Sequence, residues 1–231
     1  MSTNLAQQLR EGTTKSHSMA ENVSFVKSFL GGVVDKKSYR KLVANLFFVY
    51  EAIEEQIERN KDHDLVQFIY FPELNRRSSL IKDLMYYYGS DWRKQVSPSL
   101  ATQSYIARIH EVGKIQPELL IAHAYTRYMG DLSGGQILKK IAQNAMQLSD
   151  TVGTSFYDFD LIDDEQVFKQ SYRQSLDNIP LTDQQVRQIV GEANIAFNLN
   201  MRVFQELNSN LIKIMLMLLT TTVNNFRKKM S

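Results

Sequence analysis

Apolar residues recur along this chain at intervals of three and four positions, over stretches much longer than a β-strand. The clearest case is the stretch 36–59, whose apolar positions share one helical face: Leu42, Leu46, Val49, Ile53 and Ile57. This recurrence marks an amphipathic helix, whereas strands alternate in steps of two. Only 4 prolines and 10 glycines interrupt the 231 residues, so long helices are possible almost throughout. The pattern predicts an all-α fold, a single helical bundle.

Glycines, prolines and polar positions divide the chain into predicted helices. Their expected ranges are 5–30 with an interruption near Asn22 and a cap at Gly31 and Gly32, 36–59, 72–88 closed by Gly89, 98–112 closed by Gly113, 117–148, 163–178, 182–207 and 208–228. The acidic stretch 149–166 is expected to be a surface loop. Because no repeat, linker or low-complexity run occurs, the sequence predicts one domain over 1–231, with a core of about 5–207 and a final helix of about 208–228.

Charge and hydropathy exclude two classes of partner. The 27 Lys and Arg residues against 25 Asp and Glu give a formal charge of +2, too small to indicate nucleic-acid binding. No stretch approaches the roughly 20 apolar residues of a membrane span. The longest candidate, Leu211 to Val223, contains Lys213 and is expected to be a core or partner-facing helix. The polar N-terminus lacks the apolar run of a signal peptide, so we expect a cytoplasmic protein with no membrane span.

Several kinds of reaction centre are excluded by what the chain lacks. Cysteine is absent, which excludes thiolate zinc sites, iron–sulfur clusters and thiol nucleophiles and fits a reducing compartment. No Glu-x-x-His or His-Glu-x-x-His spacing occurs, so a ferritin-like di-iron centre and a zincin are not supported. No P-loop occurs either, which leaves phosphate chemistry without support.

Three glycines lie close together inside the predicted helix 117–148, at Gly130, Gly134 and Gly135. Each destabilises a helix interior by about 1 kcal/mol relative to alanine, so their cluster indicates a close approach to the backbone. Arg127, Gly130, Asp131 and Gly134 form one helical stripe without an apolar side chain. One interpretation is a helix kinked at the glycines and pressed against a flat ligand. A close crossing of two helices through small residues fits the spacing equally well.

His17 is the second candidate for chemistry, in the middle of the first predicted stretch with Glu21 one turn later on the same face. A single helical histidine is more often a surface or satisfied core residue than a ligand. His63, His110 and His123 have to be weighed in the same way.

Two segments carry a resemblance to a known family. Residues 117–143, PELLIAHAYTRYMGDLSGGQILKKIAQ, resemble the distal-helix signature of the heme oxygenases, and residues 10–17, REGTTKSH, with 20–22, AEN, resemble that family's proximal helix. Further segments match at 46–60, 70–74 and 168–173. The resemblance covers about residues 5 to 207 and lacks the apolar tail of membrane-bound members. It is closest to the soluble heme oxygenases of cyanobacteria and algae, which feed bilin pigment synthesis.

The resemblance implies a reaction. Heme b is expected to be both substrate and oxygen-activating cofactor, lying between a proximal helix and the glycine-kinked distal helix. Molecular oxygen and electrons would open the ring at the α-meso carbon, giving biliverdin IXα, carbon monoxide and ferrous iron. The outcome expected for the cell is bilin synthesis and iron release.

The resemblance also implies roles for individual residues. His17 would be the axial ligand of the heme iron, its ring oriented by Glu21, and Gly130 and Gly134 would let the distal helix approach the porphyrin. Asp131 would anchor a distal hydrogen-bond network whose other members are Arg127, Tyr50, Thr126 and Asn200. The heme propionates would meet Lys169, Arg173, Arg10 and Tyr125. Phe197 and Phe204 would line the pocket.

Each of these residues also has an ordinary structural interpretation. Arg127 and Asp131 fit an i, i+4 ion pair worth about 0.3 to 0.5 kcal/mol. Lys169 and Arg173 fit a solvated pair on a helix surface, and aromatic core packing explains Phe197 as well as a heme pocket does. Arg10 stands where the family pattern has Lys, so the resemblance supports its role less directly than the roles of Lys169 and Arg173.

Electrons have to come from another protein, because the chain has no flavin, nicotinamide or iron–sulfur fingerprint. Soluble members of the family accept electrons from reduced ferredoxin, an acidic protein, and we hypothesise that it docks near the proximal side. The basic residues that suit such docking are Lys36, Lys37, Arg40, Lys41, Arg76, Arg77, Lys139 and Lys140.

Two rival classes of function stay open at this point. A heme-binding protein without turnover would keep His17 and the propionate cations but would need neither Asp131 nor a glycine-lined distal face. A purely structural helical bundle would use the glycines only for packing.

Overall fold

The computed structural model describes residues 4–149 and 152–229, and the side chains of 4–149 and 152–207. The α-helices are α1 (Leu5–Gly12), α2 (Thr14–Glu21), α3 (Ser24–Leu30), α4 (Lys36–Arg59), α5 (Arg77–Tyr88), α6 (Trp92–Gln95), α7 (Leu100–Ile115), α8 (Leu120–Ala124), α9 (Gly130–Met146), α10 (Glu165–Asp177) and α11 (Asp183–Lys229). Short 3-10 or π-helical turns join them: η1 (Val66–Ile69), η2 (Pro72–Leu74), η3 (Pro117–Leu119), η4 (Tyr125–Met129) and η5 (Ser155–Tyr157). These described residues contain no β-strand, which confirms the all-α prediction.

Side-chain caps fix the start of several helices. The carboxylate of Asp35 accepts the backbone N–H of Ser38 at the start of α4, and Asp164 caps α10. Ser99 caps α7, because a short polar side chain satisfies an N–H that has no partner inside the helix. Gly32 and Gly89 adopt left-handed backbone, with φ of 75° and 80°, after α3 and α5, as expected of glycines that end helices.

The first helical stretch is divided more often than predicted. The sequence predicted one interruption near Asn22, and a second break lies at Thr13 between α1 and α2. The Thr13 hydroxyl donates to the carbonyl of Leu9 at 2.7 Å, a local bond that competes with the regular helical pattern. The chain therefore turns before His17, which lies on its own short helix.

Gly113 does not close a helix, as the sequence predicted, but lies inside α7. A Cβ atom there would meet the Gln56 side chain of α4 at 2.4 to 3.0 Å. The glycine is therefore needed for the close approach of α4 to α7 rather than for a cap.

The acidic stretch 149–166 is only partly a surface loop. Asp160 and Asp163 are exposed, but Phe156, Tyr157 and Phe159 are buried. Aromatic rings of this size are buried even in a loop whose flanks are charged, because burial of each contributes about 2 to 3 kcal/mol. Residues 156, 157 and 159 of this stretch are thus part of the packed interior.

The two predicted helices 182–207 and 208–228 are one continuous helix, α11. No glycine or proline stands at the predicted junction, so nothing in the backbone chemistry ends the helix there. The side chains of Leu211 to Val223 lie outside the described ones. Over the part of the chain that the structure describes, no helix has the length and apolar content needed to cross a membrane.

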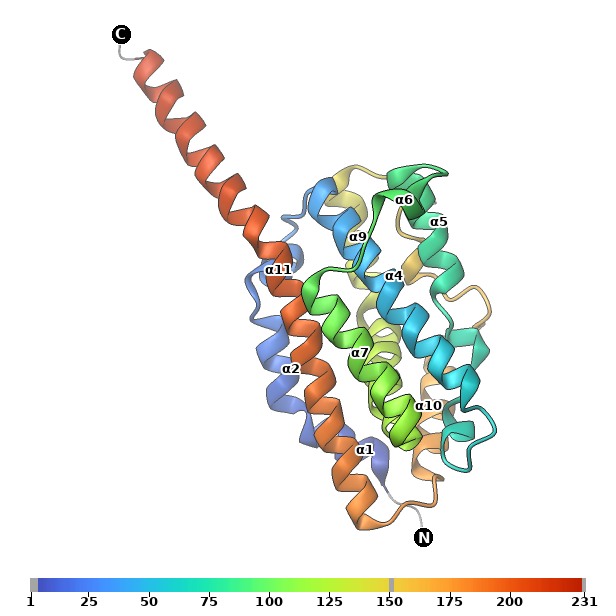
Figure 1. The fold of residues 1–231 in the computed structure, drawn as a ribbon. Helices are drawn as coiled ribbons and strands as arrows, with labels where there is room; N and C mark the ends of the chain where they lie inside the picture. Colours follow the sequence, from blue (N-terminus) through green and yellow to red (C-terminus); the bar gives the residue numbers. More distant parts are fainter. Residues whose placement is uncertain (1–3, 150–151, 230–231) are drawn as a thin grey trace.

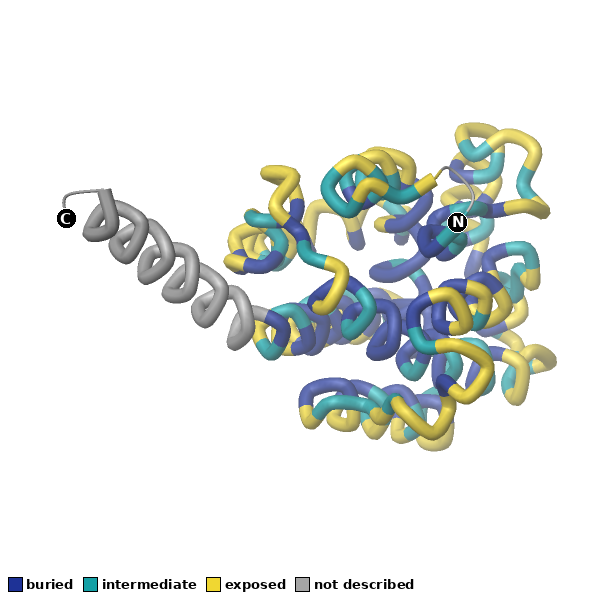
Figure 2. Tube along the Cα trace, turned by 90° about the horizontal axis from the view of Figure 1, so that it is seen from above, coloured by how far each residue is buried: buried dark blue, intermediate teal, exposed yellow. Residues whose placement is uncertain are grey.

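Helices α4, α7 and α11 run side by side and carry much of the packing (Figure 1). α11 also contacts α1, α2, α3 and α8, while α4 contacts α5 and α8. Buried residues gather on the inward sides of the helices and exposed ones on the outer turns (Figure 2). The largest fully buried side chains include Tyr39, Tyr50, Tyr105, Tyr172 and Phe47.

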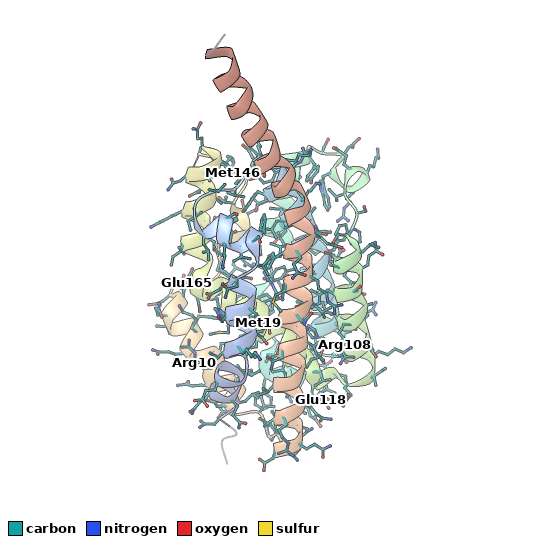
Figure 3. The ribbon with its side chains drawn as sticks, turned by 90° about the vertical axis from the view of Figure 1, so that its left-hand side faces the viewer. Arg10, Met19, Arg108, Glu118, Met146 and Glu165 are labelled. Carbon is teal, nitrogen blue, oxygen red and sulfur yellow. The ribbon has the colours of Figure 1, made fainter. Side chains whose placement is uncertain are left out.

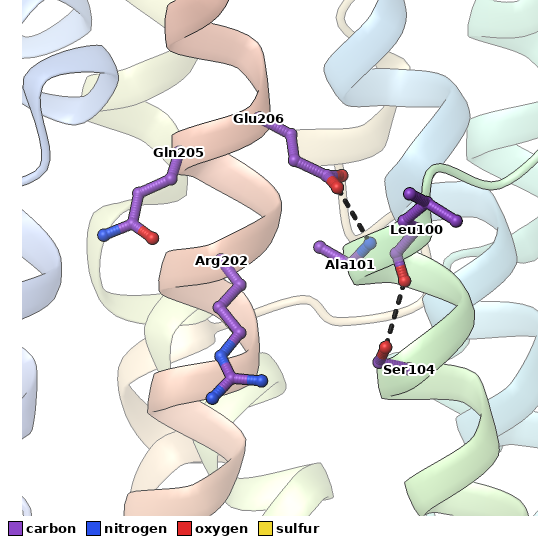
Figure 4. Close-up of a pocket in the computed structure, with 6 residues that line it drawn as sticks. All are labelled: Leu100, Ala101, Ser104, Arg202, Gln205 and Glu206. Carbon is purple, nitrogen blue, oxygen red and sulfur yellow. Dashed lines mark hydrogen bonds between the residues drawn. The ribbon is translucent and has the colours of Figure 1, made fainter.

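A shallow depression of about 410 Å³ lies between the start of α7 and α11. Figure 4 shows Glu206 of α11 accepting the backbone N–H of Ala101, at 3.0 Å, in the first turn of α7. This bond satisfies a helix-terminal N–H and ties the two helices together. None of the site residues predicted from the sequence lines the depression.

Candidate functional site

His17 lies on α2, a helix on which no residue is buried. Its side chain is 60% exposed, and Nδ1 lies 3.6 Å from Oε1 of Glu21. The ring also meets Phe197 of α11 edge-on, with centroids 5.8 Å apart. A carboxylate that holds Nδ1 presents Nε2 as the ligating nitrogen. Glu21 thus lies where its carboxylate could orient the ring of His17, and no residue of this helix is buried.

The predicted helix 117–148 changes its winding next to the glycines. The turn η4 is π-helical and ends directly before Gly130, the first residue of α9. The prediction put the distortion at the glycines themselves, and the structure puts it one turn earlier, because a π turn accommodates an extra residue within the helix. Such turns often occur at functional sites.

The three glycines do not share one environment. A Cβ built on Gly130 or on Gly134 would meet no side chain or neighbouring backbone within 4 Å, whereas one on Gly135 would lie 3.5 Å from the Tyr157 ring. A close crossing of helices would place backbone atoms beside Gly130 and Gly134. The open space there instead favours the interpretation that these two glycines face a ligand.

The charged residues of the stripe form a buried network with Tyr50 and Asn200. The Tyr50 hydroxyl donates to Oδ2 of Asp131. The Arg127 guanidinium donates to the Tyr50 hydroxyl at 3.1 Å, to the Asn200 carbonyl oxygen at 3.1 Å and to Oδ1 of Asp131 at 3.3 Å. Four residues from α4, η4, α9 and α11 are therefore joined in the interior. Arg127 and Asp131 form more than the exposed ion pair that their spacing alone allows.

Burial and neighbouring charges act in opposite directions on this network. Burial raises the pKa of Asp131, while Arg127, the hydrogen bond from Tyr50 and Arg76 lower it. Burial also raises the pKa of Tyr50 well above its usual value. The protonation of both groups therefore depends on the balance between burial, which favours the neutral forms, and the nearby cations, of which Arg127 acts on both.

Thr126 belongs to the same region but makes no side-chain hydrogen bond to the network. Its side chain is buried, and the hydroxyl oxygen has no hydrogen-bond partner in the structure. A buried hydroxyl without a hydrogen-bond partner lowers the stability of the folded protein.

Positive side chains gather near Tyr125. Burial raises the pKa of Tyr125, and the charges of Arg173 and Arg10 lower it, so α1, η4 and α10 bring these three residues together. Arg10 and Arg173 are exposed. Lys169 is buried and donates to the carbonyl of Leu132 at 3.4 Å. This arrangement suits carboxylate groups at a partly open edge.

Phe197 and Phe204 occupy different surroundings. Phe197 contacts His17, while Phe204 stacks on Phe25 of α3 with ring centroids 6.2 Å apart. Both rings are half-buried. Of the two rings, only Phe197 contacts His17, the predicted ligand of the heme iron.

One of the basic residues predicted for partner docking lies in the interior. Arg76 is buried at 3% exposure, and its guanidinium donates to the backbone carbonyls of Leu74, Phe156 and Asp158. A buried arginine is held by such fixed acceptors. Arg77 forms an ion pair with Glu51, and Lys139 with Asp158, while Lys36, Lys37 and Lys140 are exposed and Arg40 and Lys41 are half-buried.

Sequence reasoning missed a polar cluster that borders the network. Glu192 of α11 accepts hydrogen bonds from Arg108, at 2.6 and 3.0 Å, and lies 3.0 Å from His123. Tyr105 packs against the His123 ring and accepts a hydrogen bond from Asn200. In Figure 3 Arg108 lies on one side of α11 and Met19 of α2 on the other. These residues are isolated in the sequence, and no spacing indicates their association.

These features fit heme. Iron in a porphyrin needs one exposed protein nitrogen, which His17 provides, and the flat ring needs a face without side chains, which Gly130 and Gly134 provide. The cations around Tyr125 suit its propionates. A Cβ at either glycine would occupy the open space.

Comparison with known proteins identifies the family. The family model described as heme oxygenase matches residues 3–206. A heme oxygenase of the red alga Porphyra purpurea is 66% identical over 99% of this chain and 97% of its own, and heme oxygenase 1 of Synechocystis is 62% identical over 92% and 88%. The crystal structure of heme oxygenase-1 from Synechocystis in complex with heme superposes with a TM-score of 0.92 at 58% identity, covering 96% of this chain and all of that chain. This chain belongs to the heme oxygenase family.

Proposed function

We propose that this protein binds heme between α2 and α9 and converts it, with molecular oxygen and external electrons, to biliverdin, carbon monoxide and ferrous iron. The observation that carries the proposal is the combination of an exposed, carboxylate-oriented His17 with a glycine face that opens beside a buried Asp131 network. A binding protein without turnover has no use for that network. Cleavage at the α-meso carbon is part of the proposal.

The bound heme supplies both the ring that is opened and the iron that activates oxygen. His17 holds the iron from the α2 side, and Glu21 keeps the ring of His17 in one orientation. Gly130 and Gly134 let the α9 backbone lie close to the opposite face. Arg10, Lys169, Arg173 and Tyr125 hold the propionates and thereby fix which edge of the ring faces α9.

Asp131 holds and releases protons at the distal face. Its carboxylate is fixed by Tyr50 and Arg127, and Arg127 is fixed in turn by Asn200. Because burial raises the pKa of Asp131, this carboxylate can take up a proton and pass it to water near the glycines. Thr126 lies next to Arg127 in the chain and offers a further hydroxyl there.

The electron donor and the physiological setting also belong to the proposal. The proposed electron donor is reduced ferredoxin, an acidic protein whose surface would be attracted to the exposed lysines Lys36, Lys37 and Lys140. We propose that the product, biliverdin, is used for the synthesis of bilin pigments. The cytoplasmic location and the single-domain division stay predictions from the sequence.

A hemin titration followed by absorption tests the binding step. We expect the wild-type protein to bind one hemin with a shifted Soret band. His17→Ala should still bind hemin through the propionate cations and the apolar pocket but lose the imidazole spectrum, which added imidazole should restore. His63→Ala serves as the control, because His63 accepts a backbone N–H in a distant turn. An unchanged spectrum for His17→Ala would make another residue the ligand.

A further inference from the structure

The distal helix α9 has one open side and one closed side. Gly130 and Gly134 border open space, whereas Gly135 lies against the ring of Tyr157, whose Cδ1 is 3.5 Å from the position of a Cβ. Tyr157 is 4% exposed and belongs to the loop between α9 and α10. The closed side of α9 is therefore packed against this loop.

Three polar side chains of α9 contact the same loop. Gln136 donates to the carbonyl of Tyr157 at 3.1 Å, Lys139 pairs with Asp158 at 2.6 Å, and Gln143 donates to Thr154 at 3.2 Å. Positions 136, 139 and 143 lie on one face of a helix because they are separated by one turn and by about two turns. The loop therefore follows α9 along its closed side.

The loop is fixed in turn to α5. Asp83 is fully buried and accepts the backbone N–H groups of Ser155 and Phe156, both at 2.8 Å. The Tyr87 hydroxyl donates to the carbonyl of Gly153 at 2.9 Å. Gly153 has φ of 76°, and a Cβ there would lie 2.7 to 2.8 Å from the Tyr86 and Tyr87 side chains. Only glycine allows this close approach.

Arg76 provides a second anchor, at the start of α5. Its guanidinium donates to the carbonyl of Asp158 and lies 3.8 Å from the centroid of the Phe159 ring. The backbone N–H of Arg76 donates to Glu54 of α4 at 2.5 Å. The loop thus connects α9 to α5 and, through Arg76, to α4 by hydrogen bonds that are buried or partly buried.

We propose that residues 153–159 form a brace that positions α9 from behind, and that Tyr157 is the positioning residue through which it acts on the glycine segment. The proposal rests on the proposed function in taking the ligand on the open side to be heme. Glycines weaken α9 from within, so the distance between its open face and a ligand has to be fixed by an external contact. Sites held by packed, hydrogen-bonded support keep their geometry.

The test compares two pairs of variants. Tyr157→Leu removes the ring that contacts Gly135, and Tyr157→Phe keeps the ring while removing the hydroxyl. Asp158→Ala removes the partner of Lys139, and Asp160→Ala removes an exposed carboxylate of the same loop that faces Lys82 at 3.8 Å instead of α9. Amide hydrogen exchange of the heme-free protein is measured over residues 136–143, with residues 103–112 of α7 as the internal reference.

The brace predicts a local effect. Exchange over 136–143 should accelerate roughly tenfold or more in Tyr157→Leu and several-fold in Asp158→Ala, relative to α7. Asp160→Ala should leave that ratio unchanged. Tyr157→Phe keeps the ring against Gly135 but loses the hydrogen bond with the buried Tyr39 hydroxyl, so it should accelerate exchange less than Tyr157→Leu. Equal acceleration in α7 and α9 would mean a loss of general stability and would overturn the brace.

A second measurement separates positioning from mere packing. In the hemin complex, the position of the Soret band is followed as the pH is varied. The pH at the midpoint of its change should shift in Tyr157→Leu but not in Asp160→Ala, because α9 carries Asp131 and Gly130 beside the ligand. An unmoved midpoint in a variant with accelerated exchange would reduce Tyr157 to a packing residue and contradict the proposal. Failure of wild-type protein to bind hemin would instead contradict the proposed function, while the exchange result would still decide whether the brace exists.

Discussion

Asp131 is influenced by three features of its surroundings. It is 9% exposed, accepts hydrogen bonds from Tyr50 and Arg127, and lies next to a glycine that faces open space. Burial disfavours its anion while the two donors favour it. A carboxyl group with such opposing influences is suited to exchange protons with water at the open face.

Asp131→Asn should therefore separate binding from turnover. The amide keeps the shape but cannot hold a negative charge, so the turnover rate should fall about 100-fold while the hemin dissociation constant changes less than about threefold. Single-turnover kinetics and a hemin titration measure the two quantities, with Asp160→Asn as an exposed control. A proportional loss of hemin affinity would assign Asp131 to binding.

Glu192 gives a prediction about pH and stability. Burial alone would raise its pKa, but the hydrogen bonds with His123 and Arg108 outweigh burial and lower it to about 2. Because the pKa in the folded protein lies below the unfolded value, the stabilisation is complete above about pH 4.5 and is lost as the pH falls toward 2.

Glu192→Gln should then destabilise the heme-free protein by about 2 to 4 kcal/mol at pH 7, and by progressively less below pH 4.5. Urea unfolding at several pH values measures the difference. Glu111→Gln is the matched control, because Glu111 also pairs with Arg108 but is 54% exposed. An equal loss in both variants at pH 7 would show that burial of Glu192 is unimportant.

Residues within a sequence signature could be found from the sequence, and residues that meet only through the fold could not. His17 with Glu21 and Arg127 with Asp131 are one turn apart, so their contact follows from helical spacing. His123 and Glu192 lie far apart in the chain and meet only because α8 packs against α11. Arg76 likewise is held by the carbonyls of Phe156 and Asp158, which lie 80 and 82 residues later in the chain.

At the scale of elements, α9 shows how two neighbouring glycines can have different functions. Gly134 faces open space and Gly135 faces Tyr157. Neither has a positive φ, so alanine can adopt the backbone conformation of both.

The pair Gly134→Ala and Gly135→Ala separates the two functions. Each should stabilise the heme-free protein by about 0.5 to 1 kcal/mol, because alanine is the better helix former. Only Gly134→Ala should weaken hemin binding, by roughly tenfold, since its methyl group enters the ligand's space. Thermal unfolding and hemin titration measure both effects. Equal hemin affinities would show that the open face of α9 is not the ligand face.

Helix existence was easier to predict than helix ends. The long apolar periodicity of 36–59 reproduces α4 to the residue, because one face of that helix packs on the core along its whole length. The break at Thr13 and the π turn at 125–129 depend on local hydrogen bonds, which apolar spacing does not report. Gly113 was misread because a glycine can serve a helix crossing as well as a helix end.

At the scale of the whole molecule, α9 and α2 differ in burial. α9 packs against the 153–159 loop, which is itself bonded to α5, whereas α2 contacts α11 but has no buried residue of its own. A ligand between α2 and α9 would therefore complete the packing of α2 while leaving α9 where its support holds it. The central claim is that this ligand is heme and that the protein opens its ring.

An absorption time course tests this claim most directly. The purified protein is mixed with hemin and given an electron donor in air, with catalase present to remove free peroxide. We predict loss of the Soret band together with growth of a red-absorbing bilin band, and much slower change for Asp131→Asn in parallel. A stable Soret band in the wild-type protein would contradict turnover and leave a heme-binding protein, and no Soret shift on adding hemin would contradict heme binding altogether.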